Sequence, residues 1–283
     1  MFRTIGRTWA LVKQSWGVLS DDRELVAFPV MSLLAMGIVV AVFAGLAAAT
    51  GSLDHLRGAV DPATGRTVHH FTVVDGVLLV LGMVSLYFVA IFFNAALIEG
   101  AIQRLRGNNP TIGGALSATL PRAHAILGWA IISASVGVLL SVARERTGIV
   151  GRIVLAIVGG VWAYLTFFVV PVLVVQGLDP IAAIKESSSL FRRTWGNQVV
   201  ANVGFGLFYV VAILVAFIPA AALFALSPVA GIVLGAVTMA FAYSVVAALE
   251  GIFRAALYQF ASDGTPPAGF DASDLAGSYR AKS

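Results

Sequence analysis

The chain has 283 residues, of which 59% are hydrophobic and only 11% are charged. Soluble domains are about half apolar and a quarter charged, so this composition excludes an ordinary soluble fold and predicts that lipid replaces much of the core. Cysteine is absent, which excludes disulfides and thiolate metal sites. The net charge of +4 favours basic loops beside anionic lipid headgroups, with no nucleic acid partner.

Six stretches are long and apolar enough to cross a bilayer, which takes about 20 residues of helix. They are Leu25–Ala49, Val73–Ile98, Ala125–Val142, Ile149–Val175, Val199–Leu226 and Val229–Phe260. Barrel strands are excluded because strands alternate over only about 10 residues. The sequence therefore predicts an all-α membrane protein, a six-transmembrane-helix bundle in one domain (residues 1–261), followed by a flexible cytoplasmic tail (residues 262–283).

The distribution of Lys and Arg predicts that both termini lie in the cytoplasm. In that topology thirteen of these residues fall on the cytoplasmic side and five on the outer side, as the positive-inside rule requires. Arg144, Arg146 and Arg152 are three of the five outer residues. If one hairpin of the topology were assigned wrongly, the error would lie at this loop, because it carries the most positive charge on the outer side.

A short segment precedes each odd-numbered span, and we expect each to form an amphipathic helix in the headgroup layer. Asp179-Pro180 predicts the start of the third helix, as an N-cap followed by proline at the first helical position. The alternative is that these segments only extend the transmembrane helices into the cytoplasm. The expected apolar faces are Ile5, Trp9, Val12, Trp16 and Leu19; Ile112, Leu116, Leu120 and Leu127; and Ile181, Ile184, Phe191 and Trp195.

The even-numbered spans end alike, in Glu99-Gly100, Gln176-Gly177 and Glu250-Gly251. A unit of one interfacial helix and two spans is thus repeated three times, at about residues 1–104, 105–177 and 178–261. Parallel repeats of this kind predict a pseudo-threefold bundle about the membrane normal.

Several stretches are typical of one family. Residues 167–177 read FFVVPVLVVQG, residues 182–196 read AAIKESSSLFRRTWG, and the opening carries KQSW and ELVAFP. Together they resemble an uncharacterised family of prokaryotic six-span membrane proteins over nearly the whole chain. The resemblance implies a location in the inner membrane of a prokaryotic cell, and it carries over no activity, cofactor or catalytic residue. It also implies that an acid often stands where this chain has Gln176.

Six polar residues near the ends of the spans form a candidate intramembrane site. A charged side chain at the bilayer centre costs about 2.5–3.5 kcal/mol on insertion scales, so such groups are usually paired or functional. An arginine follows each glutamate by four or five residues, and a spacing of four allows a pair on one helix. Two interpretations are open: ion pairs that fix helix register, or an ion, proton or headgroup site. The six residues are Glu99, Glu250, Gln176, Asn94, Arg104 and Arg254.

Small residues and prolines inside the spans predict close packing and kinks. Gly231 and Gly235 form a GxxxG at the start of span six, which favours close helix contact. Pro171 and Pro219 each remove a backbone hydrogen bond and should kink spans four and five.

The sequence contains no P-loop, HExxH, GxSxG or dinucleotide fingerprint, so catalysis is not expected. His55, His69 and His70 in the outer loop match no metal motif, and neither a metal nor a cofactor is expected. We expect a non-enzymatic scaffold or accessory subunit of the cell membrane, with membrane lipids, a further copy or another membrane protein as partners. The alternative is a transporter or lipid-handling protein with a groove between helix repeats, and a third reading is a membrane enzyme with its site in the outer loop.

Overall fold

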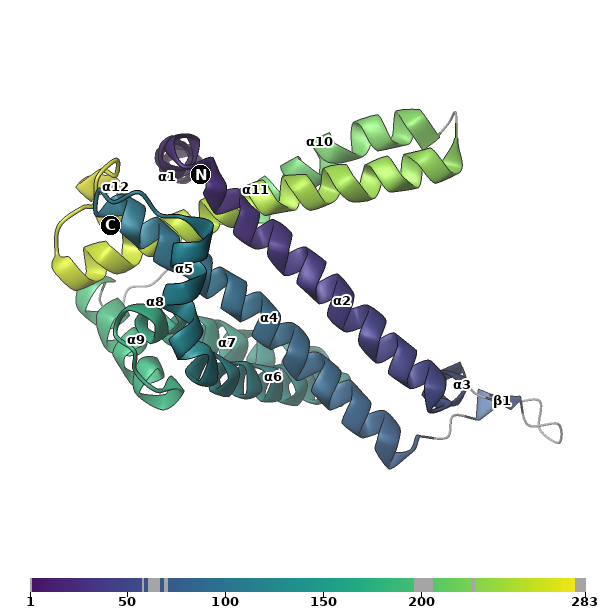
Figure 1. Ribbon diagram of the computed structural model, residues 1–283. Coiled ribbons are helices and arrows are strands. Elements are labelled where there is room, and N and C mark those ends of the chain that lie inside the picture. The colour runs from purple at the N-terminus through teal and green to yellow at the C-terminus, as the bar shows by residue number, and fades with distance from the viewer. Residues whose placement is uncertain are drawn as a thin grey trace.

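The computed structural model is almost entirely helical (Figure 1) and describes residues 2–57, 59–60, 67–68, 71–195, 206–224 and 227–277. Within these residues five helical stretches are long and apolar enough to cross a membrane, and they coincide with expected spans one to four and six. They make the chain a multi-pass membrane protein by length and composition. The expected fifth span, Val199–Leu226, lies partly outside the described residues. The five stretches are Arg23–Ala49, Val73–Leu105, Ile112–Glu145, Ile149–Val175 and Pro228–Asp263.

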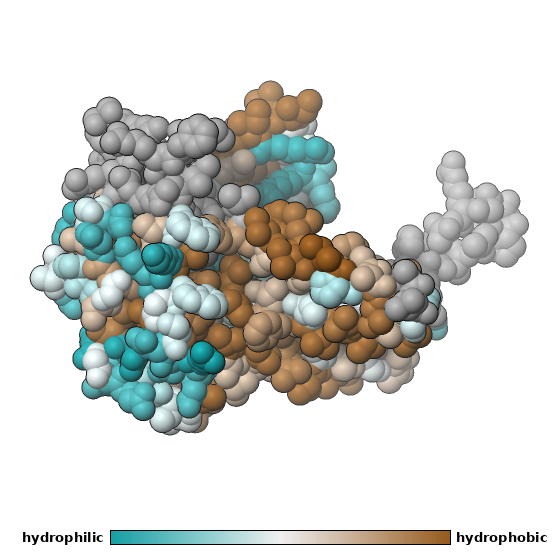
Figure 2. All heavy atoms as spheres, turned by 90° about the horizontal axis from the view of Figure 1, so that it is seen from above, coloured by the Kyte–Doolittle hydropathy of each residue, from teal (hydrophilic) through white to brown (hydrophobic). Residues whose placement is uncertain are grey.

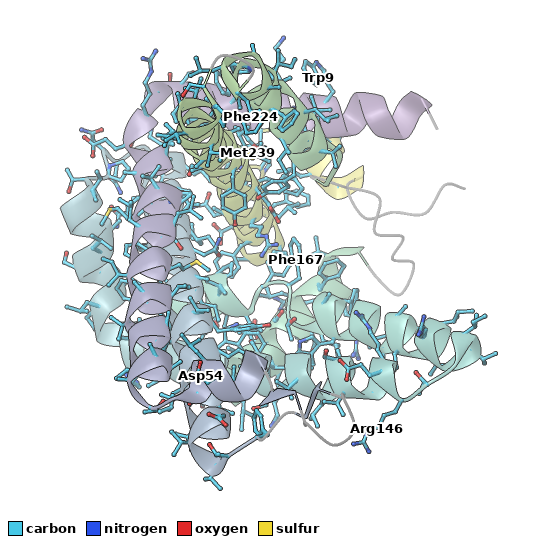
Figure 3. The ribbon with its side chains drawn as sticks, turned by 90° about the vertical axis from the view of Figure 1, so that its right-hand side faces the viewer. Trp9, Asp54, Arg146, Phe167, Phe224 and Met239 are labelled. Carbon is cyan, nitrogen blue, oxygen red and sulfur yellow. The ribbon has the colours of Figure 1, made fainter. Side chains whose placement is uncertain are left out.

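Three helical hairpins extend from one end of the molecule. Figure 3, which looks from their free ends, shows them as separate pairs. At its free end the first hairpin carries α3 (Ser52–Arg57) and an antiparallel pair of two-residue strands, β1 (Ala59–Val60) and β2 (Thr67–Val68). The pairs are α2 (Ala27–Ala49) with α4 (Val73–Leu105), α6 (Ala123–Glu145) with α7 (Ile149–Leu165), and α10 (Gly206–Phe224) with α11 (Pro228–Asp263).

The short helices gather at the opposite end, where they pack on the C-terminal halves of α4 and α11; we call this end the base. Figure 2 shows polar side chains over the side where α1 and α12 lie and apolar side chains over the α10–α11 hairpin. The short helices of the base are α1 (Phe2–Asp21), η1 (Arg23–Val26), α5 (Ile112–Thr119), η2 (Leu120–Arg122), α8 (Val169–Val175), α9 (Pro180–Trp195) and α12 (Ala272–Gly277).

The protein's own hydrophobic core lies in the base. Large side chains exposed by 2% or less come from most of its elements, whereas along the hairpins Leu34, Leu139 and Leu214 are each more than 60% exposed. Apolar side chains need not be buried in protein where hydrocarbon surrounds them. The core residues include Leu11, Phe28, Leu97, Ile98, Phe168, Phe191, Phe253 and Tyr258.

Two local predictions about helix ends and packing are confirmed. The Asp179 carboxylate accepts hydrogen bonds from the backbone N–H groups of Ile181 and Ala182, at 3.0 and 3.1 Å, so α9 begins at its predicted cap. Gly231 and Gly235 allow α11 to approach α10 closely. A Cβ on Gly231 would collide with the backbone of Phe224, and one on Gly235 would lie 3.1 Å from Cβ of Ala220.

On these three segments, the side chains that are buried in the base are only partly those of the expected apolar faces. In α1 the tryptophans Trp9 and Trp16 are 62% and 54% exposed, and Leu11, Ser15 and Val18 are buried instead. The buried face of α1 is thus rotated about the helix axis relative to the expected apolar face, because the buried face is the one that packs on the neighbouring helices of the base. In the other two segments as well, residues outside the expected apolar face are buried. Leu120, Leu127 and Ile181 are exposed, and Ala115, Ala183 and Leu190 are buried.

The residues after α11 pack against α1. The sequence predicts a flexible tail for residues 262–283, and the described part extends to Gly277. Phe270 is 8% exposed and Leu275 is fully buried. Gln14 donates to the Asp274 carboxylate at 2.8 Å and accepts from the backbone N–H of Asp271 at 3.3 Å. This contact ties the two terminal segments of the described chain together.

Candidate functional site

Span four breaks before it reaches the base. The helix α7 ends at Leu165 and α8 begins at Val169, so the structure has a break where the sequence predicts a kink at Pro171. Proline has no N–H to donate to the carbonyl four residues earlier, which is that of Phe167. Within the break, the backbone N–H of Phe168 donates to Oγ of Ser187 on α9, at 2.9 Å, and Ser187 is fully buried.

Aromatic rings surround this break. The Phe191 ring of α9 lies 4.4 Å from that of Tyr164, 5.7 Å from that of Phe167 and 5.9 Å from that of Phe168, between ring centroids. The Phe168 ring also lies 6.1 Å from that of Tyr258 on α11. These spacings are those of favourable aromatic pairs, so the break is fixed by packing.

Glu250 is the centre of a polar cluster beside the break. Arg254 donates from Nη2 to Oε1 of Glu250 at 2.6 Å, which confirms the predicted pair, and Tyr209 of α10 donates to Oε2 at 3.0 Å. The guanidinium carbon of Arg254 also lies 5.4 Å from the centre of the Phe167 ring, within the range of a cation–π contact. The cluster therefore joins α10, α11 and the α7–α8 break, and Figure 3 shows Phe167 between the second and third hairpins.

Glu99 does not pair with Arg104, so of the two open interpretations the ion pair with the following arginine applies only to Glu250. Glu99 accepts a hydrogen bond from Nε2 of Gln103 at 2.8 Å, while Arg104 lies 3.4 Å from the Asp21 carboxylate at the end of α1. The reason is helical geometry. A residue four positions on lies on the same face, whereas one five positions on is turned away.

Gln176 and Asn94 complete the predicted set. Gln176 donates from Nε2 to the hydroxyl of Tyr258 at 3.1 Å, which links α8 to α11. Asn94 is half-buried on α4. The contacts of the six residues form separate groups around Glu99, Glu250 and Gln176.

The glycine that follows each of these three residues lies at a close approach. A Cβ on Gly100 would lie 3.0 Å from the Leu25 side chain, and one on Gly251 would overlap the Leu97 side chain. Gly177 adopts a φ of +67°, which favours glycine, and the Arg122 guanidinium occupies the place of its Cβ. The polar–glycine pair at the end of each even span thus combines a hydrogen bond with a close contact.

A buried carboxylate at the foot of the first hairpin was not singled out from the sequence. Asp22, between α1 and η1, is only 7% exposed, and its Oδ2 has no hydrogen-bond partner in the part of the chain that the structure describes. Burial raises the pKa of Asp22 above its ordinary value. The positive charge of Arg104 opposes the rise, the negative charge of Glu24 adds to it, and a hydrogen bond from the backbone of Glu24 opposes it. Asp22 is therefore a destabilised anion in the folded protein.

Sequence reasoning also missed Ser187, Gln103 and the role of Tyr209. Tyr209 lies 41 positions from Glu250 and Ser187 lies 19 from Phe168, so no local pattern announces these contacts. Gln103 could have been found, because it stands four residues after Glu99. His69 and His70 lie outside the described residues, as does the side chain of His55. Among residues that are described, no group of three or more His, Asp or Glu side chains could hold a metal ion.

Chemically, the Glu250 cluster pairs a carboxylate with a guanidinium and a phenol and ties three elements together. The comparison with family models identifies a family of unknown function, DUF6159, over residues 73–270. No curated protein and no solved structure matches the chain. The family match covers well over half of the chain and confirms the resemblance to an uncharacterised family. The chain belongs to DUF6159, a family of unknown function.

Proposed function

We propose that the protein is a non-enzymatic scaffold or accessory subunit of the prokaryotic inner membrane, with six spans and both termini in the cytoplasm. One observation carries this proposal: the hairpins share a base, and beyond it α10 packs mainly on α11. Leu214, Phe217 and Phe241 of this hairpin are 54–61% exposed. Such lateral faces allow packing with helices of another membrane protein or of a second copy.

The polar contacts of the base support a structural role over transport. A transport or proton site needs acids that face a common path. Glu99 accepts from its own helix, and both oxygens of Glu250 are occupied by Arg254 and Tyr209. Groups paired in this way hold helices in register.

The charge distribution supports a cytoplasmic base. Arg144, Arg146 and Arg152 lie around the free end of the second hairpin, where Figure 3 labels Arg146. The base holds more positive charges, as expected on the cytoplasmic side. They are Lys13, Arg23, Arg104, Arg106, Arg122, Lys185, Arg192, Arg193 and Arg254.

An exposed stripe on α1 supports its place among anionic headgroups. Trp9, Lys13 and Trp16 are all exposed and recur at intervals of four and three residues, so they share one face. The Trp9 ring stacks on that of Phe208, at the start of apolar α10, with 6.1 Å between centroids. The stripe therefore lies at the level where the apolar helix α10 begins. Tryptophan and lysine are both favourable at this boundary between lipid headgroups and hydrocarbon.

The three polar–glycine pairs support the pseudo-threefold repeat. Gly100, Gly177 and Gly251 each meet a neighbouring side chain at the end of an even span. We infer that the third unit contains the expected fifth span, built around α10 (Gly206–Phe224), which brings the total to six.

The scaffold role is tested by photo-cross-linking in native membranes. A benzoylphenylalanine at Leu214 or Phe217 should give one discrete adduct, either with a partner protein or at twice the chain mass of 29.5 kDa. The same cross-linker at Phe253, which is 2% exposed, is the matched control and should give none. Lipid adducts alone at both exposed positions, together with a monomer in native nanodiscs, would reject the role.

The topology is tested by cysteine labelling, for which the chain offers no background because it has no cysteine. A membrane-impermeant maleimide added to intact cells should label Thr147→Cys and not Asn108→Cys. The reverse pattern would place the base outside the cytoplasm.

A further inference from the structure

The first hairpin does not close along its whole length. A cavity of about 370 Å³ lies between the outer half of α2 and the facing part of α4, in the half of the hairpin that is remote from the base. Both helices are long and apolar enough to cross a membrane. Its walls include Val40, Phe43, Ala44, Ala47, Leu79 and Gly82.

The side chains of α2 explain why the space exists. Ring atoms of Phe43 lie 3.3 Å from the point where Gly82 would carry a Cβ, so the Phe43 side chain spans the gap from α2 to α4 at this level. Ala44 and Ala47 follow on the same wall, and alanine is too small to reach α4 as Phe43 does. The space therefore results from the sequence of α2, in which the large Phe43 is followed by the small Ala44 and Ala47.

The polar groups at the end of this space are already satisfied. Ser52 and Asp75 are each only 2% exposed. Oγ of Ser52 lies 2.9 Å from Oγ1 of Thr50, and the Asp75 carboxylate accepts from the backbone N–H and the hydroxyl of Thr72, at 2.7 and 2.8 Å. Specific polar ligands need convergent polar groups that are free to bind them. This lining suits hydrocarbon.

The space opens sideways into the surroundings of the hairpin. Val40 and Leu79 line it and are still 54% and 53% exposed. An apolar space that is narrow, opens to the side and has no free polar group is suited to a flexible hydrocarbon chain from the surrounding lipid.

We propose that this groove binds one acyl chain of a phospholipid from the leaflet at the free ends of the hairpins. The chain lies between Ala44, Ala47 and Leu79, and its headgroup lies beyond Ser52. Burial of methylenes against α2 and α4 holds the chain more firmly than a bulk lipid, because the groove walls are fixed and close-packed. This inference goes beyond the scaffold role and does not depend on it.

The test uses the full chain in nanodiscs that contain a phospholipid with a diazirine near the middle of one acyl chain. Photolysis should place label preferentially on groove residues of α2 and α4, compared with exposed Leu214 of α10. Ala44→Trp fills the groove and should lower groove labelling roughly tenfold. The matched control is Gly45→Trp, at the same depth but on another face of α2, where a Cβ would meet nothing within 4 Å.

Thermal unfolding shows whether Ala44→Trp is folded, and Ala47→Phe is a second, smaller groove-filling variant with the same expected result. Label spread evenly over α2, α4 and Leu214 in the wild-type chain overturns the proposal without any variant. Equal groove labelling in Ala44→Trp and Gly45→Trp overturns it as well. Cross-links from the groove to a second copy of the chain would also overturn it.

Discussion

Both the base and the hairpins contain large apolar side chains, but protein surrounds those of the base, whereas those of the hairpins are left for lipid to surround. In the base, helices meet with buried side chains such as Phe28 and Phe253; in the hairpins, Leu214 and Phe241 remain exposed by about 61%. One helix, α11, passes through both regions. The comparison teaches that hydropathy alone does not locate the core of this protein, because lipid accepts the same residues that the base buries.

The largest expected difference in stability is between two phenylalanine substitutions on the same helix, one in the base and one in the hairpin. Phe253→Ala leaves a cavity in the base and should lower the free energy of unfolding by about 3–5 kcal/mol. Phe241→Ala, twelve residues earlier on α11, should change it by less than about 1 kcal/mol, because that ring is 61% exposed. Thermal unfolding in detergent measures both. Equal losses would remove the distinction between the two regions.

Adding a side chain at a glycine should also destabilise the base more than a hairpin. Gly251→Val places a side chain where Leu97 already stands and should cost about 1–3 kcal/mol. Gly45→Val on α2, where a Cβ would meet nothing within 4 Å, should change stability by no more than about 0.5 kcal/mol. The same unfolding assay applies, and a neutral Gly251→Val would contradict the packing of the base.

The polar cluster at Glu250 should contribute less. Tyr209→Phe removes one hydrogen bond to a half-buried carboxylate and is expected to lower stability by about 1 kcal/mol. The control is Tyr243→Phe, whose ring lies 5.6 Å from that of Tyr209 and whose hydroxyl makes no hydrogen bond to described residues. If the two variants have the same free energy of unfolding, the Tyr209–Glu250 hydrogen bond does not contribute to stability.

The last expected effect is of similar size and has the opposite sign. Asp22→Asn removes the buried anion and should raise stability near neutral pH by about 1 kcal/mol. Because the folded pKa of Asp22 is raised above 3.8, the folded state binds more protons, and the wild-type chain loses stability as the pH rises through that range. Asp22→Asn should lack this component. Unfolding followed from acid to neutral pH measures it, and an unchanged slope would contradict the burial of Asp22.

The sequence correctly predicts five of the spans, the cap at Asp179 and the Glu250–Arg254 pair, because each depends on residues close together in the chain. It does not predict which face of α1 is buried, since Trp9 and Leu11 are both apolar and only the packing of α11 and α12 decides between them. The contacts of Tyr209 with Glu250 and of Gln176 with Tyr258 join residues 41 and 82 positions apart. No local periodicity contains this information.

The most direct measurement is nitroxide accessibility in bilayers at two cysteines on α11, Phe241→Cys and Phe253→Cys. The account predicts that Phe241→Cys is accessible to oxygen, which dissolves in lipid, and not to a water-soluble nickel complex. It predicts that Phe253→Cys is accessible to neither, since protein surrounds it. Strong nickel accessibility at position 241, or high oxygen accessibility at both positions, would contradict the division into a protein-packed base and lipid-solvated hairpins.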